Sequence, residues 1–183
     1  MGAMPVSGVR LARTSDADGV ADVNVRSWRL RFAQTLPPEA LASLDASDLA
    51  LVWAGAVINP PTTGHRLLVA VEGDAILGYA AIGPSQDPDA DPQTLELLAL
   101  EVDPEHHREG HGSRLMAAAV DHARGAGMTS AATWCALDDE TRRSFLVSSG
   151  WGPDTALRDI LVGTDADVSD LLVREARLVT DLT

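Results

Sequence analysis

The chain has 183 residues, about the length of one ordinary domain, of which 45% are hydrophobic and 22% charged. This composition excludes a wholly disordered, collagen-like or coiled-coil chain, and the longest apolar runs are far shorter than the roughly 18 residues of a membrane-spanning helix. The 27 acidic residues outnumber the 14 basic ones, which argues against nucleic acid or an anionic membrane as the main partner. We therefore expect a single domain over residues 1–183, with no nucleic acid and no membrane among its partners.

The only cysteine is Cys135, so no disulfide can form within the chain. Residues Met1–Arg13 contain no apolar segment followed by a small-residue cleavage site. Both features predict a cytoplasmic protein, because the cytoplasm is reducing. Cys135 falls in a predicted strand without an adjacent cation, which favours a small buried residue over a nucleophile.

The first 60 residues indicate one strand and two helices. Val9–Arg13 alternates as a strand does, and Thr14-Ser15-Asp16 offers N-caps for a helix through about Arg31. A second helix is predicted over Pro38–Val57, and the prolines at 60 and 61 end it because they lack an amide donor.

Strands follow. Leu67–Glu72 and Ile76–Ile82 are apolar runs joined by the tight turn Gly73-Asp74, a pattern typical of a hairpin. The acidic, proline-containing segment Gly83–Gln93 is predicted to be an exposed loop.

The next segments form a predicted β-turn-α-β unit. It consists of the strand Thr94–Val102, the helix Ser113–Ala126 and the strand Thr129–Leu137, so the two strands should run parallel.

The C-terminal part predicts one helix and two strands. The helix begins at Asp138 or Asp139 and runs through Ser149, and the strands cover about Thr155–Val162 and Leu171–Thr180.

The turn between the strand Thr94–Val102 and the helix Ser113–Ala126 carries the most chemistry. Gly110 and Gly112 allow the backbone to bend sharply and to present several N–H groups at the positive end of a helix dipole. Such a site suits a diphosphate, so a nucleotide-like cofactor is expected. The segment has neither the Gly-Lys-Ser/Thr ending of a P-loop nor the GxGxxG spacing of a dinucleotide fold.

Two motifs resemble one known family. Val102-Asp103-Pro104 followed by His107–Gly112 resembles the acetyl-CoA signature Gln/Arg-x-x-Gly-x-Gly/Ala of the GNAT superfamily of N-acetyltransferases. The segment Phe145–Trp151 is similar to that family's Phe-Tyr-x-x-x-Gly-Phe. The resemblance covers nearly the whole chain and implies an α/β (α+β) acyltransferase fold, with a twisted, mixed, mostly antiparallel sheet of about seven strands flanked by about four helices.

The resemblance also implies where acetyl-CoA binds. The sheet would be splayed beside the signature strand, where strand groups would pair with the pantetheine arm, and the backbone amides of the loop would hold the diphosphate. The implied cofactor-binding residues are Leu100, Glu101, Val102, His107, Arg108, Glu109, Gly110, His111, Gly112 and Ser113.

Two positions depart from the family pattern. His107 stands where Gln or Arg is usual, which leaves the backbone amides available. Leu146 stands where many members carry the tyrosine proposed to protonate the departing thiolate, and leucine donates no proton.

Glu96 is the expected general base, since it matches the position of that group in several family members. Strand alternation predicts that Glu96 shares a mostly apolar face with Leu98, Leu100 and Val102, where its pKa would be raised. The alternative is a carboxylate paired with an arginine such as Arg66. Glu101 is expected on the opposite face, solvated or in a salt bridge.

Three aromatic residues are candidates for the acceptor pocket: Trp28, Phe32 and Tyr79. The alternative for each is ordinary packing of a helix or the sheet. His106, His107 and His111 are expected to form a rim around the phosphates rather than a metal site, because two glycines interrupt the helix that a zinc pair would need.

The predicted function is transfer of an acetyl group from acetyl-CoA to a primary amine, most simply of a small molecule, in a ternary complex. The alternatives are acetylation of a protein N-terminus or lysine, and a non-catalytic acyl-CoA sensor, to which Leu146 points; a docking protein is a weaker third. A homodimer through Leu171–Thr180 is a further hypothesis.

Overall fold

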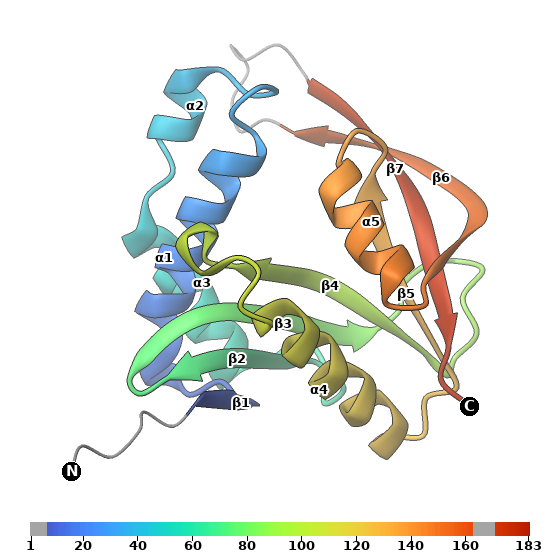
Figure 1. The fold of residues 1–183 in the computed structure, drawn as a ribbon. Coiled ribbons are helices and arrows are strands. Elements are labelled where there is room, and N and C mark those ends of the chain that lie inside the picture. Colours follow the sequence, from blue (N-terminus) through green and yellow to red (C-terminus); the bar gives the residue numbers. More distant parts are fainter. Residues whose placement is uncertain (1–6, 163–170) are drawn as a thin grey trace.

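The computed structural model describes residues 7–162 and 171–183, and their central feature is one twisted seven-stranded sheet in the order β1-β2-β3-β4-β5-β7-β6 (Figure 1). The strands are β1 (Ser7–Leu11), β2 (Arg66–Glu72), β3 (Ala75–Pro84), β4 (Thr94–Val102), β5 (Ser130–Ala136), β6 (Gly152–Val162) and β7 (Leu171–Asp181). The helices are α1 (Ala17–Arg31), α2 (Pro38–Ala42), α3 (Ala46–Ile58), α4 (His111–Gly125) and α5 (Glu140–Ser148), with short 3₁₀ turns at Thr14–Asp16 and Pro104–His106.

The pairing follows the sequence pattern. β2 and β3 form the predicted hairpin, and β4 and β5 run parallel with α4 as the crossover between them. The other neighbouring strands are antiparallel. The predicted mixed, mostly antiparallel α/β sheet is therefore confirmed.

Helices cover both faces of the sheet, as Figure 1 shows. On one face, α4 and α5 bury a core around Leu97, Leu115 and Leu146. On the other face, Val20 and Val23 of α1 pack against β2 and β3. These two layers hold β4 between them, and β4 is the strand that carries the candidate site.

The predicted helix Pro38–Val57 is wrong in one respect, since the structure divides it into α2 and α3. Ser43 closes the short α2, and Asp45 has extended backbone angles that begin a new helix. The Asp45 carboxylate accepts a hydrogen bond from the Ser47 N–H at 2.7 Å, the interaction of an N-cap. This break gives five α-helices in the described residues where about four were expected.

The face assigned to Glu96 is also wrong. Ala81 pairs with Ala99 but Ile82 pairs with Leu97, so Leu98 is an extra residue, a β-bulge in β4. Beyond a bulge the side chains change face. Leu97 and Leu100 therefore both enter the core under α4, whereas Glu96 and Glu101 share the opposite face.

The C-terminal strand lies inside the sheet. β7 is paired with β5 on one edge and β6 on the other, so the edge strands are β1 and β6. A homodimer that forms by pairing onto Leu171–Thr180 has no free edge there. β6 starts earlier than predicted, at Gly152, and bulges between Pro153 and Leu157, where Thr155 has a φ of 77°. Among the described helices, none is both long enough and apolar enough to cross a membrane.

Removal of the cap should destabilise α3. We predict that Asp45→Ala lowers the free energy of unfolding by about 1 kcal/mol, because the N–H of Ser47 loses its acceptor. Denaturant titration measures this change. Asp45→Asn keeps a capping oxygen and should stay close to the wild type, so an equal loss in both variants would contradict the interpretation.

Candidate active site

The turn from β4 into α4 presents a row of free backbone donors. Gly110 has a φ of 83° and Arg108 a φ of 68°, so the chain bends sharply before the helix begins. In the described part of the chain, the backbone N–H groups of residues 108–113 have no hydrogen-bond partner. We call these six N–H groups the amide cradle. They lie at the positive end of α4, which suits an anion.

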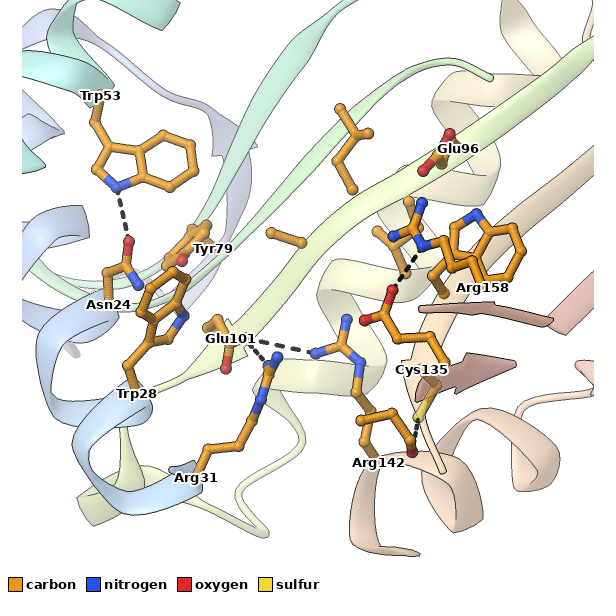
Figure 2. A pocket seen from close by; sticks show the side chains of 16 residues that line it. Asn24, Trp28, Arg31, Trp53, Tyr79, Glu96, Glu101, Cys135, Arg142 and Arg158 are labelled. Atoms are coloured by element: carbon orange, nitrogen blue, oxygen red, sulfur yellow. Dashed lines mark hydrogen bonds and ion pairs between the residues drawn. The ribbon is translucent and has the colours of Figure 1, made fainter. Parts of the chain in front are cut away.

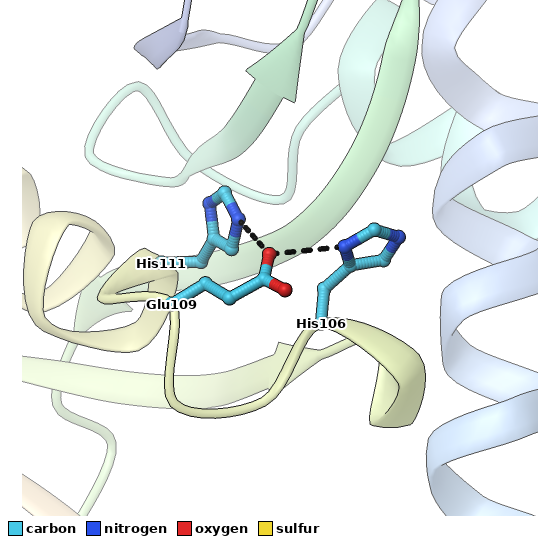
Figure 3. Close-up of side chains that lie close together, drawn as sticks. All are labelled: His106, Glu109 and His111. Carbon is cyan, nitrogen blue, oxygen red and sulfur yellow. Dashed lines mark hydrogen bonds and ion pairs between the residues drawn. The ribbon is translucent and has the colours of Figure 1, made fainter.

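Side chains around the cradle hold its shape. The His107 Nε2 lies 3.1 Å from the carbonyl oxygen of Val102, which ties the loop to the end of β4. The Glu109 carboxylate contacts both His106 Nδ1, at 3.0 Å, and His111 Nε2, at 3.5 Å (Figure 3). These contacts hold the pKa of Glu109 below its ordinary value, chiefly through the hydrogen bond from His106.

His106, Glu109 and His111 are residue types that bind metal ions, and their ligand atoms lie within 4.8 Å of one another. One contact bears on the tautomer of the neutral His111 ring. Arg114 Nη2 lies 2.9 Å from His111 Nδ1, and because a guanidinium only donates, Nδ1 accepts. The proton of the neutral ring is therefore on Nε2, where it points at Glu109 and leaves no lone pair for a metal. The cluster is better described as hydrogen-bonded support for the cradle.

β4 and β5 separate next to this cradle. Their parallel pairing covers Thr94–Glu96 with Ser130–Ala132, and the Thr133 hydroxyl then donates to the Leu97 carbonyl at 2.8 Å. We call the opening beyond this point, between residues 98–102 and 134–136, the strand gap. An extended polar chain can pair with the open edge of a strand in such a gap.

A cavity of about 210 Å³ lies on the opposite side of β4 from α4 (Figure 2). It is bounded by α1 and α3 at one end and by β5, β6 and β7 at the other. Its polar and aromatic lining includes Asn24, Trp28, Arg31, Trp53, Tyr79, Glu96, Glu101, Trp134, Arg142, Arg158 and Glu175.

Glu96 differs from the other acids of the cavity. It is 8% exposed, and its one side-chain hydrogen bond in the described structure comes from the Ser85 hydroxyl at 3.3 Å. Burial and the nearby carboxylate of Asp87 raise the pKa of Glu96. The alternative partner, Arg66, instead donates to the carbonyls of Thr63 and His65.

Glu101 is buried and forms the salt bridge that was expected as one of its two alternatives. Arg31 Nη1 lies 2.7 Å from Glu101 Oε1, and the Ser27 hydroxyl donates to Oε2. Arg142 Nη1 lies 3.6 Å from the same carboxylate. The Glu101 side chain therefore belongs to the cavity, on the other side of β4 from the core under α4.

Two of the three predicted acceptor residues line the cavity. Trp28 and Tyr79 do so, while Phe32 instead packs edge-on against Trp28 with ring centroids 5.7 Å apart. Asn24 was missed by the sequence analysis. Its Oδ1 accepts from Trp53 Nε1 at 3.1 Å, and its Nδ2 is buried without a partner in the described residues. That donor is available to a bound molecule.

The sequence analysis also missed the far wall of the cavity, which is formed by residues of β5, β6 and β7. Arg158 stacks over Trp134 at 4.3 Å and donates to Glu175 at 2.7 Å. Trp134 therefore lines the cavity. Spacing along the sequence gives no signal for this wall, since its members come from three strands.

Cys135 is buried, in agreement with the packing role expected of it, and Leu146 is buried too. Burial raises the pKa of the Cys135 thiol, which disfavours the nucleophilic thiolate. Leu146 is 0% exposed in the core beside Trp151. A proton donor for the reaction is therefore not found at Leu146.

Comparison with known proteins agrees with this geometry. Residues 26–151 match the model of the acetyltransferase (GNAT) family. The uncharacterized N-acetyltransferase YuaI of Bacillus subtilis is 24% identical over 151 residues, which cover 82% of both chains. The mycothiol acetyltransferase of Kineococcus radiotolerans is 32% identical over 158 residues, which cover 85% of this chain but 45% of that relative.

A solved structure extends the likeness to three dimensions. The PaiA N-acetyltransferase from Thermoplasma acidophilum, in complex with coenzyme A, superimposes with a TM-score of 0.64 at 16% identity, over 93% of this chain and 98% of that one. Fold and family together define an acyl-group transferase. The chain belongs to the GNAT acetyltransferase family and is an N-acetyltransferase.

A carboxylate placed in the cradle should repel a diphosphate. We predict that Gly112→Asp weakens coenzyme A binding at least tenfold, because like charges would meet at the helix N-terminus. An acidic residue in the first turn favours the helix itself, so the loss would not come from unfolding. Isothermal titration calorimetry measures the affinity.

Gly125→Asp is the matched control. Gly125 lies at the other end of α4, and an added Cβ meets no atom within 4 Å there. This variant should bind coenzyme A as the wild type does. Equal binding by Gly112→Asp would show that the diphosphate is held elsewhere.

Proposed function

We propose that this protein transfers the acetyl group of acetyl-CoA to the primary amine of a small molecule, directly and within a ternary complex. The whole chain would act as one catalytic unit in the cytoplasm. The single observation that carries the proposal is Glu96: a buried carboxylate with a raised pKa and no cation bound to it, in a cavity beside the strand gap.

The open donors of the chain fit acetyl-CoA. The amide cradle supplies unpartnered N–H groups for the diphosphate, from Arg108 to Ser113. The edge of β4 at the strand gap would pair with the pantetheine arm through the backbone of Leu100 and Val102, in place of the contacts that Arg142 and His107 now make to these two carbonyls. Acetyl-CoA supplies the acyl group in activated form, as a thioester.

Glu96 would accept the proton that the attacking amine must lose. A base works best when its pKa is near the working pH, and burial moves the pKa of a carboxyl in that direction. The other acids of the cavity are less suited, since Glu101 and Glu175 are held by arginines. Their negative charges are already paired with guanidinium groups.

The cavity supports a small acceptor. Its volume of about 210 Å³ matches a compact molecule, and Trp28 and Tyr79 give one end apolar walls. The free Nδ2 of Asn24 would donate to an oxygen of that molecule. The Kineococcus relative is named for mycothiol, although this chain spans less than half of that relative.

Two other functions make different predictions. An enzyme for protein N-termini or lysines would release thiol with peptides and not with small amines. A sensor would bind coenzyme A and release no thiol with any amine, which the buried Leu146 would favour. A thiol-release assay with a panel of small amines and peptides separates these functions.

Loss of the base should remove activity and leave binding intact. We predict that Glu96→Gln lowers kcat/KM by roughly 10²- to 10⁴-fold, the usual contribution of a general base, with an unchanged affinity for acetyl-CoA. Release of free thiol with a reactive amine measures the rate. Glu72→Gln, an exposed strand residue outside the cavity, should be as active as the wild type.

The pH dependence tests the same assignment. Glu96 must be ionised to act, so kcat/KM should rise with pH through a pKa above the ordinary value for a carboxyl. The Gln variant should lack this acidic limb. If Glu96→Gln kept full turnover and the same decrease of kcat/KM at low pH, another group would be the base.

A further inference from the structure

One side chain occupies the strand gap. Arg142 comes from α5, which packs on the core side of the sheet, and its Nη1 donates to the Leu100 carbonyl at 3.1 Å. The same nitrogen lies 3.6 Å from Glu101, whose side chain is on the cavity side. Arg142 therefore passes between β4 and β5, and Figure 2 shows its guanidinium inside the cavity lining.

The guanidinium keeps unused donors. Its side chain is only 15% exposed, and the described structure gives no hydrogen-bond partner to Nε or Nη2. Because Arg142 lines the cavity, its remaining N–H groups are available to an anion bound there or in the gap.

The charges around Arg142 are nearly balanced. Arg31 adds a second cation, and Glu101 and Asp139 provide two carboxylates, with Arg31 Nε 3.8 Å from Asp139. The thiol pKa of Cys135, on β5, responds to the charges near the gap. Its thiol pKa is raised by burial, and Arg142 is the main group that opposes this rise. Arg142 therefore acts to lower the pKa of a thiol at the edge of the gap, although burial keeps the pKa of Cys135 raised overall.

We propose that Arg142 stabilises the negative charge on the sulfur that departs from the acyl group during transfer. This assignment rests on the proposed function. In the step, the amine nitrogen forms a bond to the acyl carbon and gives one proton to Glu96. The carbon–sulfur bond breaks, and its electron pair leaves on sulfur as a thiolate that receives hydrogen bonds from Nε and Nη2 of Arg142. The thiolate gains a proton from water after release.

An arginine would stabilise the leaving thiolate in a different way from a general acid. A guanidinium stays protonated at all working pH values, so it stabilises an anion by charge and hydrogen bonds and gives up no proton. The position one helical turn later, Leu146, is buried in the core and offers no donor. Arg142 thus supplies from the same helix a means of leaving-group stabilisation that requires no acid.

The test uses the thiol of bound coenzyme A, and needs no acceptor. The ultraviolet absorbance of the thiolate is followed against pH in the coenzyme A complex of the wild type, Arg142→Met and Arg142→Lys. The desulfo-coenzyme A complex serves as the blank, which removes the signal of Cys135. We expect the pKa of the bound thiol to be about one unit or more higher in the Met variant than in the wild type, and the Lys variant to lie between them.

The same variants are then assayed for transfer. Arg142→Met should lower kcat at least tenfold, with the KM for the amine unchanged and partial rescue in Arg142→Lys. Arg143→Met is the matched control, because Arg143 is bound to Glu140 and to the Leu137 carbonyl. It removes the same charge one residue away and should change neither kcat nor the thiol pKa. Circular dichroism and the melting temperature verify that the variants fold. We expect them to fold because Ser27 and Arg31 still bind the Glu101 carboxylate when Arg142 is replaced.

Three results would overturn the assignment. An unchanged thiol pKa in Arg142→Met, with a raised KM for the amine, would make Arg142 part of the acceptor site. If Arg142→Met bound acetyl-CoA more tightly with an unchanged kcat, Arg142 would only block the strand gap and would have no part in transfer. Wild-type protein that binds no coenzyme A would overturn the proposed function itself, a result distinct from the other two.

Discussion

The separation of β4 from β5 is the constraint on which the rest of the site depends. The two strands are joined over Thr94–Glu96 and Ser130–Ala132, and the Thr133 hydroxyl satisfies the next carbonyl. Buried backbone groups need partners, so an open strand edge in the middle of a sheet is stable only where another group can reach it. Here that group is Arg142, which donates to the Leu100 carbonyl. Residues of both strands beside this opening, among them Leu98 and Trp134, line the cavity.

The β-bulge at Leu98 decides which side chains meet in that cavity. In a regular strand, Glu96 and Glu101 would point to opposite faces because they are an odd number of residues apart. One extra residue in β4 brings both carboxylates to the cavity while Leu97 and Leu100 remain in the core. The bulge therefore separates two acids with different environments: Glu101 with arginines, and Glu96 with a single hydroxyl.

The distribution of cations follows the same division. Arg31 and Arg142 gather at the Glu101 end, and Arg158 is held between Glu175 and the face of Trp134. Glu96 forms no salt bridge among the described residues, and burial raises its pKa although the charge of Arg158 opposes this rise. A carboxylate suited to accept a proton and an arginine suited to hold an anion thus lie on either side of the point where the strands separate.

Local patterns in the sequence determined the order of elements, the β2–β3 hairpin, the parallel pair around α4 and the glycine turn before it, because each depends on residues close together in the chain. The family resemblance likewise rests on short motifs, and residues 26–151 confirm it. The bulge at Leu98, the break before Asp45 and the far wall of Trp134 and Arg158 were decided only by the tertiary structure. A bulge depends on the register of a neighbouring strand, and a wall built from three strands depends on how the sheet closes, so no local pattern carries either of them.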